Sequence, residues 1–146
     1  MKRISTRGII FIDDAIALIY REKNGQQYYT LPGGGLEEDE LLTDGVAREI
    51  FEEFGINAKA KKLSYVYSDE NSIAYYFLCD YVDGDFGTGQ GEEYSPERNS
   101  GFYEPRLIKI EDIKNISLKP DKLKEMLIED ILLHNKSLSD CIKFFN

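Results

Sequence analysis

The chain has 146 residues, and its net charge of −9 at pH 7 accompanies a hydrophobic content of 42%. This length and composition predict a single globular domain, residues 1–146, with enough apolar side chains to bury a core. The sequence contains no basic stripe and no apolar run of about 20 residues, so neither nucleic acid nor a membrane is expected as a partner.

The two cysteines, Cys79 and Cys141, lack the spacing of metal ligands. They are typical of reduced thiols, and we therefore expect a cytoplasmic protein. The N-terminal apolar run is interrupted by Asp13 and Asp14, which argues against a secretory leader.

Strands rich in isoleucine and aromatic residues account for much of the chain. In chain order we expect them at residues 6–13, 15–22, 25–32, 58–69, 72–82 and 103–110. Turns are expected at Asp13-Asp14 and at Glu70-Asn71.

Helices are predicted between and after these strands, at residues 38–55, 111–115 and 119–135. Gly55 closes the first helix in the position favoured after a helix end. The last helix has an apolar stripe that Asp130 interrupts. Because strands and helices interleave, the predicted fold class is α/β, with a mixed β-sheet covered by helices.

The segment 38–55 is strongly acidic. At about 100° per residue, one side of its helix is apolar and consists of Ala47, Ile50, Phe51 and Phe54, with Val46 at its edge. Roughly opposite lie three carboxylates at spacings i, i+3 and i+4, those of Glu49, Glu52 and Glu53. Gly45 lies one turn earlier on the acidic side, and Arg48 is spaced to pair with Glu52 or with a neighbouring carboxylate. Carboxylate oxygens suit Mg²⁺ or Mn²⁺, although an isolated pattern of this kind is also typical of a solvated surface.

Immediately before this helix lies the stretch Leu-Pro-Gly-Gly-Gly-Leu, residues 31–36. Glycines allow a close approach of the backbone to a ligand. Their carbonyls can add metal ligands, and their N–H groups can meet phosphate oxygens. An ordinary turn is the alternative for the glycines alone, so the combination with the acidic helix carries the interpretation.

Taken together, the glycine stretch and the acidic helix resemble the box of the Nudix hydrolase family (MutT-like), complete from Gly34 to Ile56. The matching positions are Gly34, Glu40 and the run from Arg48 to Ile56. Tyr29 stands where the family often has tryptophan, and Asp39 replaces a common glycine. The resemblance implies an α/β/α sandwich in which the box is a catalytic loop–helix–loop.

The resemblance also implies Mg²⁺-dependent hydrolysis of a pyrophosphate bond in a nucleoside diphosphate linked to another moiety, with Mn²⁺ able to substitute. The implied metal ligands are Glu49, Glu52, Glu53 and a backbone carbonyl, that of Gly33 or Gly34. Arg48 would orient the carboxylates, and Glu40 would tie the loop to the helix. The expected substrate contacts are Gly33, Gly35 and Tyr29.

The general base is left open between the box and the long polar stretch 83–101. The candidates are Glu52 and Glu53 in the box and Glu92, Glu93 and Glu97 in the long stretch. Segments of this length are often functional, and we expect this one to close over the box as a lid.

Two other functions remain in view. One is a MutT-like nucleoside triphosphate pyrophosphatase. The other is a catalytically silent nucleotide-binding or regulatory module, against which the intact set of box glutamates argues. The expected partner is a small nucleotide-type molecule, and a homodimer is left open.

Overall fold

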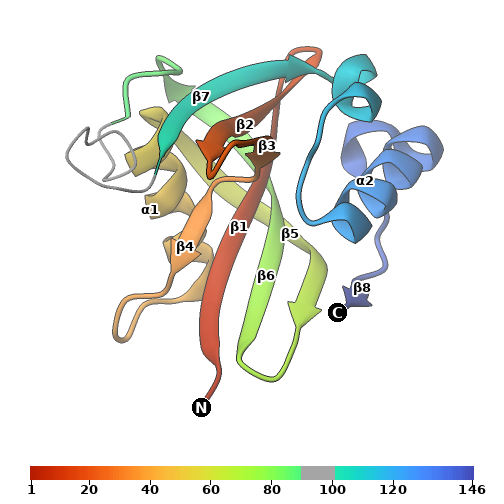
Figure 1. Cartoon of the computed structure of the whole chain (residues 1–146). Helices are drawn as coiled ribbons and strands as arrows, with labels where there is room; N and C mark the ends of the chain where they lie inside the picture. The colour runs from red at the N-terminus through yellow and green to blue at the C-terminus, as the bar shows by residue number, and fades with distance from the viewer. Residues whose placement is uncertain (90–100) are drawn as a thin grey trace.

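The computed structural model describes residues 1–89 and 101–146. A mixed β-sheet lies between helices (Figure 1). The strands are β1 (Arg3–Ile12), β2 (Ala15–Lys23), β3 (Gln26–Thr30), β4 (Gly33–Gly35), β5 (Ile56–Ser68), β6 (Ser72–Gly84), β7 (Phe102–Lys109) and β8 (Lys143–Phe145). The helices are α1 (Leu42–Phe54) and α2 (Asp121–His134), with the 3₁₀ helices η2 (Ile110–Asn115) and η3 (Asn135–Ser137).

Strand β1 joins the two halves of the sheet, whose strand order is β3-β2-β1-β6-β5-β8. Its first part runs parallel to β6, from the pair Arg3↔Ser72 onward, and its last residues pair antiparallel with β2. The short strand β4 pairs antiparallel with β1, and β7 pairs with β2. The glycine stretch is therefore held as an extended strand along β1, beside the centre of the sheet.

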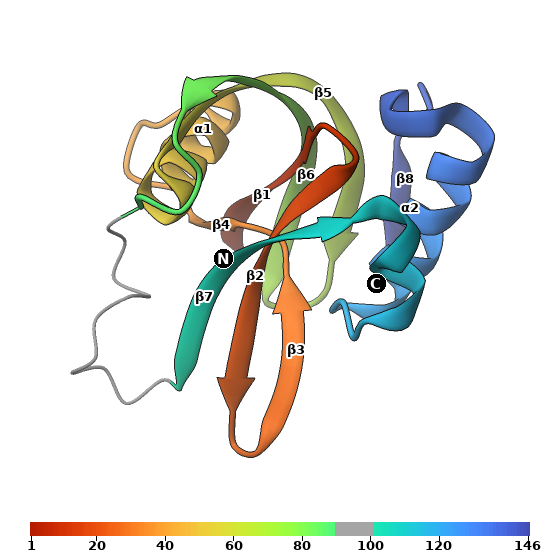
Figure 2. The same ribbon diagram turned by 90° about the horizontal axis from the view of Figure 1, so that it is seen from above.

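The two faces of the sheet carry separate apolar clusters. Side chains alternate across a strand, so Ile10 packs in the cluster beneath α1 and its neighbour Ile9 in the cluster beneath α2. In the same way, Phe77 and Leu78 of β6 enter opposite clusters. Figure 2 shows α1 and α2 on opposite sides of the sheet. The predicted α/β/α sandwich with a mixed sheet is confirmed.

Helix α1 begins at Leu42, later than the predicted start at residue 38. Asp39 adopts a φ of 60°, in the left-handed region, which cannot continue a right-handed helix. The same geometry explains why glycine is common at this position of the box. Asp is one of the few other residues that visit this region at modest cost.

Two strands, β4 and β8, were not predicted. Glycines provide no alternating side-chain pattern, so β4 resembled a loop in the sequence. Strand β8 has only three residues and pairs in parallel with β5. Across residues 1–89 and 101–146, every helix falls short of the length and apolarity that crossing a membrane requires.

Candidate active site

Helix α1 packs on the sheet through Val46, Ile50 and Phe54, none of which is exposed. The predicted apolar face was wrong at one edge, because Phe51 is 53% exposed. The helix is rotated so that Glu49 and Glu53 also turn inward, with exposures of 8% and 1%. The prediction that all three box carboxylates project away from the packed face was therefore wrong for these two.

Glu49 and Glu53 turn towards the glycine strand β4. The backbone N–H of Gly33 donates a hydrogen bond of 3.0 Å to Oε2 of Glu53. Gly34 lies so close to Glu49 that a Cβ atom on it would be 2.6 Å from Oε1 of that carboxylate. A side chain on Gly33 would meet the carbonyl oxygen of Thr6 at 2.0 Å. Glycine is therefore required at both positions to bring the strand against the two carboxylates.

Arg48 contacts Glu52 and neighbouring carboxylates as well. Its Nε and Nη2 donate to the two oxygens of Glu40, at 2.7 and 3.0 Å, in a bidentate pair. Its Nη1 donates to Oε1 of Glu49 and to Oε1 of Glu52, both at 3.2 Å. Its Nη2 also donates to the carbonyl of Gly35 at 3.3 Å. One guanidinium thus connects the helix, the loop before it and the glycine strand.

Glu40 ties the loop to the helix in the expected way. The Arg48 guanidinium and, second, the backbone N–H of Glu37 lower the pKa of Glu40 to about 2, because both stabilise its ionised form. The contacts with Glu40 in turn raise the pKa of Arg48. Gly45 serves the same junction, because a Cβ atom there would be 2.7 Å from Cδ2 of Leu36. The room that it leaves is filled by the loop of the protein itself.

A comparison with protein families gives a match that extends well beyond the residues of this site. A family model described as the NUDIX domain matches residues 1–126. The chain belongs to the Nudix hydrolase family. Both the family and the fold predicted from the box are thereby confirmed.

Several Nudix proteins are similar to this chain. An ADP-ribose pyrophosphatase from Methanocaldococcus jannaschii is 36% identical over 93 residues, covering 59% of this chain and 55% of that protein. A MutT-like protein from Streptomyces ambofaciens is 39% identical over 79 residues, covering 52% of this chain and 50% of that protein. The chain spans about half the length of these curated relatives.

The fold is also seen in a crystal structure of a NUDIX hydrolase from Nitrosomonas europaea. The two structures superpose with a TM-score of 0.74 at 22% sequence identity. The match covers 99% of this chain and 79% of that one.

Nudix hydrolases generally need divalent metal ions. Within the two described ranges, no three acidic, cysteine or histidine side chains are already grouped as a metal site. The carboxylate of Glu52, with a side chain 45% exposed, is instead hydrogen-bonded to Arg48. The donor chemistry nevertheless fits such an ion, because the glutamate carboxylates and the carbonyls of β4 are the hard oxygen ligands that Mg²⁺ and Mn²⁺ prefer.

Tyr29, a predicted substrate contact, lies in different surroundings from the box glutamates. It packs against the cluster beneath α2, with its ring centroid 5.2 Å from that of Tyr20. Its hydroxyl accepts a hydrogen bond of 3.3 Å from Arg106. The structure therefore places Tyr29 on the α2 side, whereas Gly33 and Gly35 lie beside the box helix.

The loop carboxylates proposed as alternative bases, Glu92, Glu93 and Glu97, lie outside the described residues, as does most of the expected lid.

Sequence reasoning missed one residue that supports the glycine strand. Nη1 of Arg7 in β1 donates hydrogen bonds of 3.3 Å to the carbonyls of Leu31 and Gly33. A signal was present, because Arg7 is in phase with the buried Ile9 on the same strand and so points to the same face of the sheet.

Proposed function

We propose that the chain hydrolyses a pyrophosphate bond in a nucleoside diphosphate linked to another moiety, with Mg²⁺ as its cofactor and Mn²⁺ able to substitute. The observation that carries the proposal is the hydrogen bond from the N–H of Gly33 to the buried carboxylate of Glu53. It locks the glycine strand against the acidic helix, so that the carboxylates of Glu49 and Glu53 lie against the backbone of β4.

In this proposal some box residues bind the cation and others hold these ligands in place. Glu49, Glu52 and Glu53 would hold the cation together with a backbone carbonyl of β4, that of Gly33 or Gly34. The bound cation would offset the charge of the pyrophosphate and lower the pKa of a bound water. Arg48 holds Glu49 and Glu52 in place, and Glu40 fixes the guanidinium by its bidentate pair.

The reaction needs a proton acceptor for the attacking water. As the water oxygen bonds to phosphorus, the bond from phosphorus to the bridging oxygen breaks, and a carboxylate takes the proton. Glu53 is held in one orientation by Gly33, whereas Glu52 is exposed and, among the described residues, is held by Arg48. The orientation of Glu53 favours it over Glu52 as the acceptor within the box.

The relatives support two substrate classes. The protein from M. jannaschii is named an ADP-ribose pyrophosphatase, which supports a nucleoside diphosphate joined to a sugar. The protein from S. ambofaciens is named MutT-like, which supports nucleoside triphosphates as the second candidate. A silent binding module is less well supported, because Arg48 maintains an ordered set of box carboxylates.

A panel of nucleotides incubated with Mg²⁺ would separate these functions. We expect ADP-ribose and related compounds to give a nucleoside monophosphate and a phosphorylated second product. A triphosphatase of the MutT type would instead release pyrophosphate from nucleoside triphosphates. If no compound is cleaved with Mg²⁺ or Mn²⁺ although nucleotides bind, the protein is a binding module and the proposed activity is wrong.

A further inference from the structure

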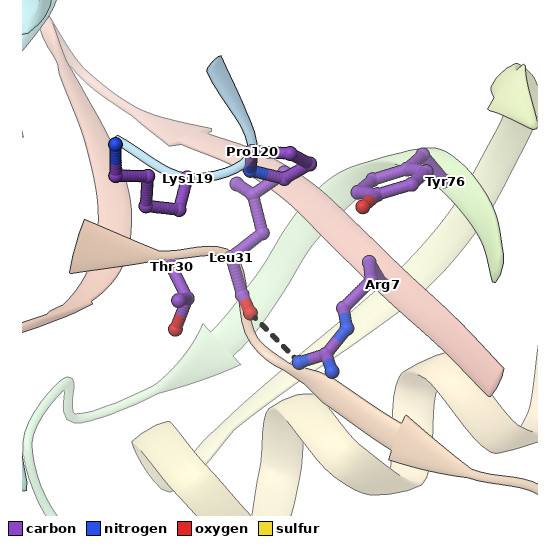
Figure 3. Close-up of a pocket in the computed structure, with 6 residues that line it drawn as sticks. All are labelled: Arg7, Thr30, Leu31, Tyr76, Lys119 and Pro120. Carbon is purple, nitrogen blue, oxygen red and sulfur yellow. Dashed lines mark hydrogen bonds between the residues drawn. The ribbon is translucent and has the colours of Figure 1, made fainter. Parts of the chain in front are cut away.

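A cavity of about 260 Å³ lies on the α2 side of the sheet, behind the glycine strand. We call it the Arg7 pocket; it is lined by Arg7, Thr30, Leu31, Tyr76, Lys119 and Pro120 (Figure 3). These residues come from β1, the end of β3, β6 and the segment before α2. None of them belongs to the box.

The charge of the pocket comes mainly from Arg7. Its Nη1 donates to two backbone carbonyls, and within residues 1–89 and 101–146 it forms no ion pair. A guanidinium has five N–H donors, so most of its hydrogen-bonding capacity is not used by the two carbonyls. Lys119 differs, because its ammonium group pairs with Asp121 at 2.9 Å. The pocket therefore offers one guanidinium whose charge is not offset by a carboxylate in the described part of the chain.

Tyr76 adds a second polar group to this pocket. Its hydroxyl is turned into the space between Arg7 and Pro120 (Figure 3). In the described part of the chain this hydroxyl has no hydrogen-bond partner. The remaining wall is apolar and consists of the ring of Tyr76, Leu31 and Pro120. A charged donor beside an apolar wall suits a compact group that has both a ring and an anion.

The pocket is connected to the box through a single residue. The carbonyl of Gly33 accepts from Arg7, while the N–H of the same Gly33 donates to Glu53. A substrate cleaved beside Glu53 therefore needs to extend only a short way to reach Arg7. The volume of about 260 Å³ is slightly below the range of about 300–1,000 Å³ usual for whole small-molecule sites, so it suits one part of a nucleotide.

We propose that Arg7 is a specificity-determining residue, and that the Arg7 pocket binds a phosphate ester on a sugar of the substrate, distinct from the pyrophosphate that is cleaved. The guanidinium of Arg7 and the hydroxyl of Tyr76 hold the phosphate, and the apolar wall covers the sugar. This inference rests on the proposed function, because it assigns a second anchor point to the same substrate.

Binding without catalysis tests the inference separately from the activity. The ligands are AMP, adenosine 2′,5′-bisphosphate and adenosine 3′,5′-bisphosphate, titrated calorimetrically in excess EDTA so that no hydrolysis occurs. We expect at least one bisphosphate to bind about 10-fold or more tightly than AMP. Equal affinity for all three compounds would overturn the inference, whatever the nucleotide panel shows.

Substitutions test which residue is responsible for the tighter binding of the bisphosphate. In Arg7→Gln the advantage of the bisphosphate over AMP should disappear. The matched control is Lys2→Gln, which removes the same charge from an exposed residue near the start of β1 and should keep the advantage. Tyr76→Phe keeps the ring and should lose part of the advantage, which provides a test if Arg7→Gln does not fold. An advantage that survives in both Arg7→Gln and Tyr76→Phe contradicts the assignment.

Inorganic phosphate distinguishes a substrate group from a free ion. If phosphate alone binds as tightly as the bisphosphate and competes with it fully, the pocket is a site for free phosphate and the substrate assignment is wrong. Turnover adds a second readout, from NADH and NADPH and from dephospho-coenzyme A and coenzyme A, which differ pairwise by one phosphate ester. Wherever the pair is cleaved, Arg7→Gln should raise KM for the phosphorylated member relative to KM for the member that lacks this phosphate.

Discussion

Helices α1 and α2 both bury carboxylates against the sheet, but the two sets have different partners. On α2, Asp130 is 1% exposed, and each of its oxygens has one donor. The hydroxyl of Tyr65 donates to Oδ2 at 2.5 Å, and the ammonium group of Lys143 to Oδ1 at 2.7 Å. On α1, a single guanidinium, that of Arg48, contacts four glutamates, namely Glu37, Glu40, Glu49 and Glu52.

This difference distinguishes Asp130, a carboxylate with a structural role, from the box glutamates, to which we assign the chemistry. Asp130 joins β5, α2 and β8 with one acid, one cation and one hydroxyl, so its charge is matched where it lies. Burial, together with the hydrogen bond to Asp130, raises the pKa of Tyr65 and keeps it a donor. Among the described residues, the Arg48 cluster shares one positive charge among several acids, which is the balance expected where added cations are part of the function.

Among the changes that test this comparison, the removal of divalent metal should have the largest effect on activity. Excess EDTA should abolish turnover, and added Mg²⁺ should raise the melting temperature, because a cation reduces repulsion among the box glutamates. Calorimetry and a product assay measure the two effects. Asp130→Asn should show the same rise with Mg²⁺ as the parent protein. Undiminished turnover in EDTA would contradict the metal mechanism.

The substitution Glu53→Gln should have the second largest effect, a loss of turnover. The amide oxygen can still accept from Gly33, but the charge and the proton acceptor are lost, so kcat should fall at least about 100-fold, or about 2.7 kcal/mol. Asp44→Asn, an exposed neutral substitution in the first turn of α1, is the control and should keep its rate. A folded Glu53→Gln protein with a normal rate would place the chemistry elsewhere.

Asp130→Asn should lower the stability of the protein and leave its activity almost unchanged, unlike Glu53→Gln. Lys143 would lose its anionic partner and Tyr65 would lose an ionised acceptor, so the free energy of unfolding should fall by about 2 kcal/mol while kcat/KM stays within about twofold. Urea titration gives the first value and a product assay the second. Glu129→Gln, on the exposed neighbour, should change neither. A loss of activity without a loss of stability would mean that the two helices do not divide their roles in this way.

The smallest expected effect is the contribution of Glu40 to the pH dependence of the free energy of unfolding. Its pKa in the folded protein is about 2, below the usual 4.5, so the pair with Arg48 stabilises the fold fully above about pH 4.5. This stabilisation should be lost as the pH falls from about 4.5 to about 2. Glu40→Gln should therefore unfold more easily than the parent at pH 7 and almost equally at pH 2. The exposed Glu38→Gln variant should follow the parent at both values.

The sequence was most informative where side chains alternate or where a motif is complete. The long strands β5 and β6 and the box helix were predicted because their apolar periods are clear. The pairing of Arg48 with Glu40 was not predicted from spacing, since it depends on the left-handed turn at Asp39, which folds the loop back onto the helix.

The remaining errors have the same kind of cause. A helical wheel alone could not decide whether Val46 or Phe51 bounds the packed face, because the sheet and β4 set the rotation of α1. Strand β4 was hidden because glycines have no side-chain pattern. The phase of Arg7 with Ile9 indicated the face of the sheet on which its side chain lies, but its role depends on the carbonyls of Leu31 and Gly33, whose positions the sequence does not indicate.

The parallel pairing of β1 with β6 also governs the order of assembly. It joins Arg3 to Ser72, and the whole box lies between these two strands in the chain. Contacts between distant segments slow folding, because a long stretch must be ordered before they form. On the ribosome, β1 and the box helix emerge well before β6 is complete. We therefore expect the apolar cluster beneath α1, which includes Phe77 of β6, to stay incomplete on the nascent chain until β6 has paired with β1.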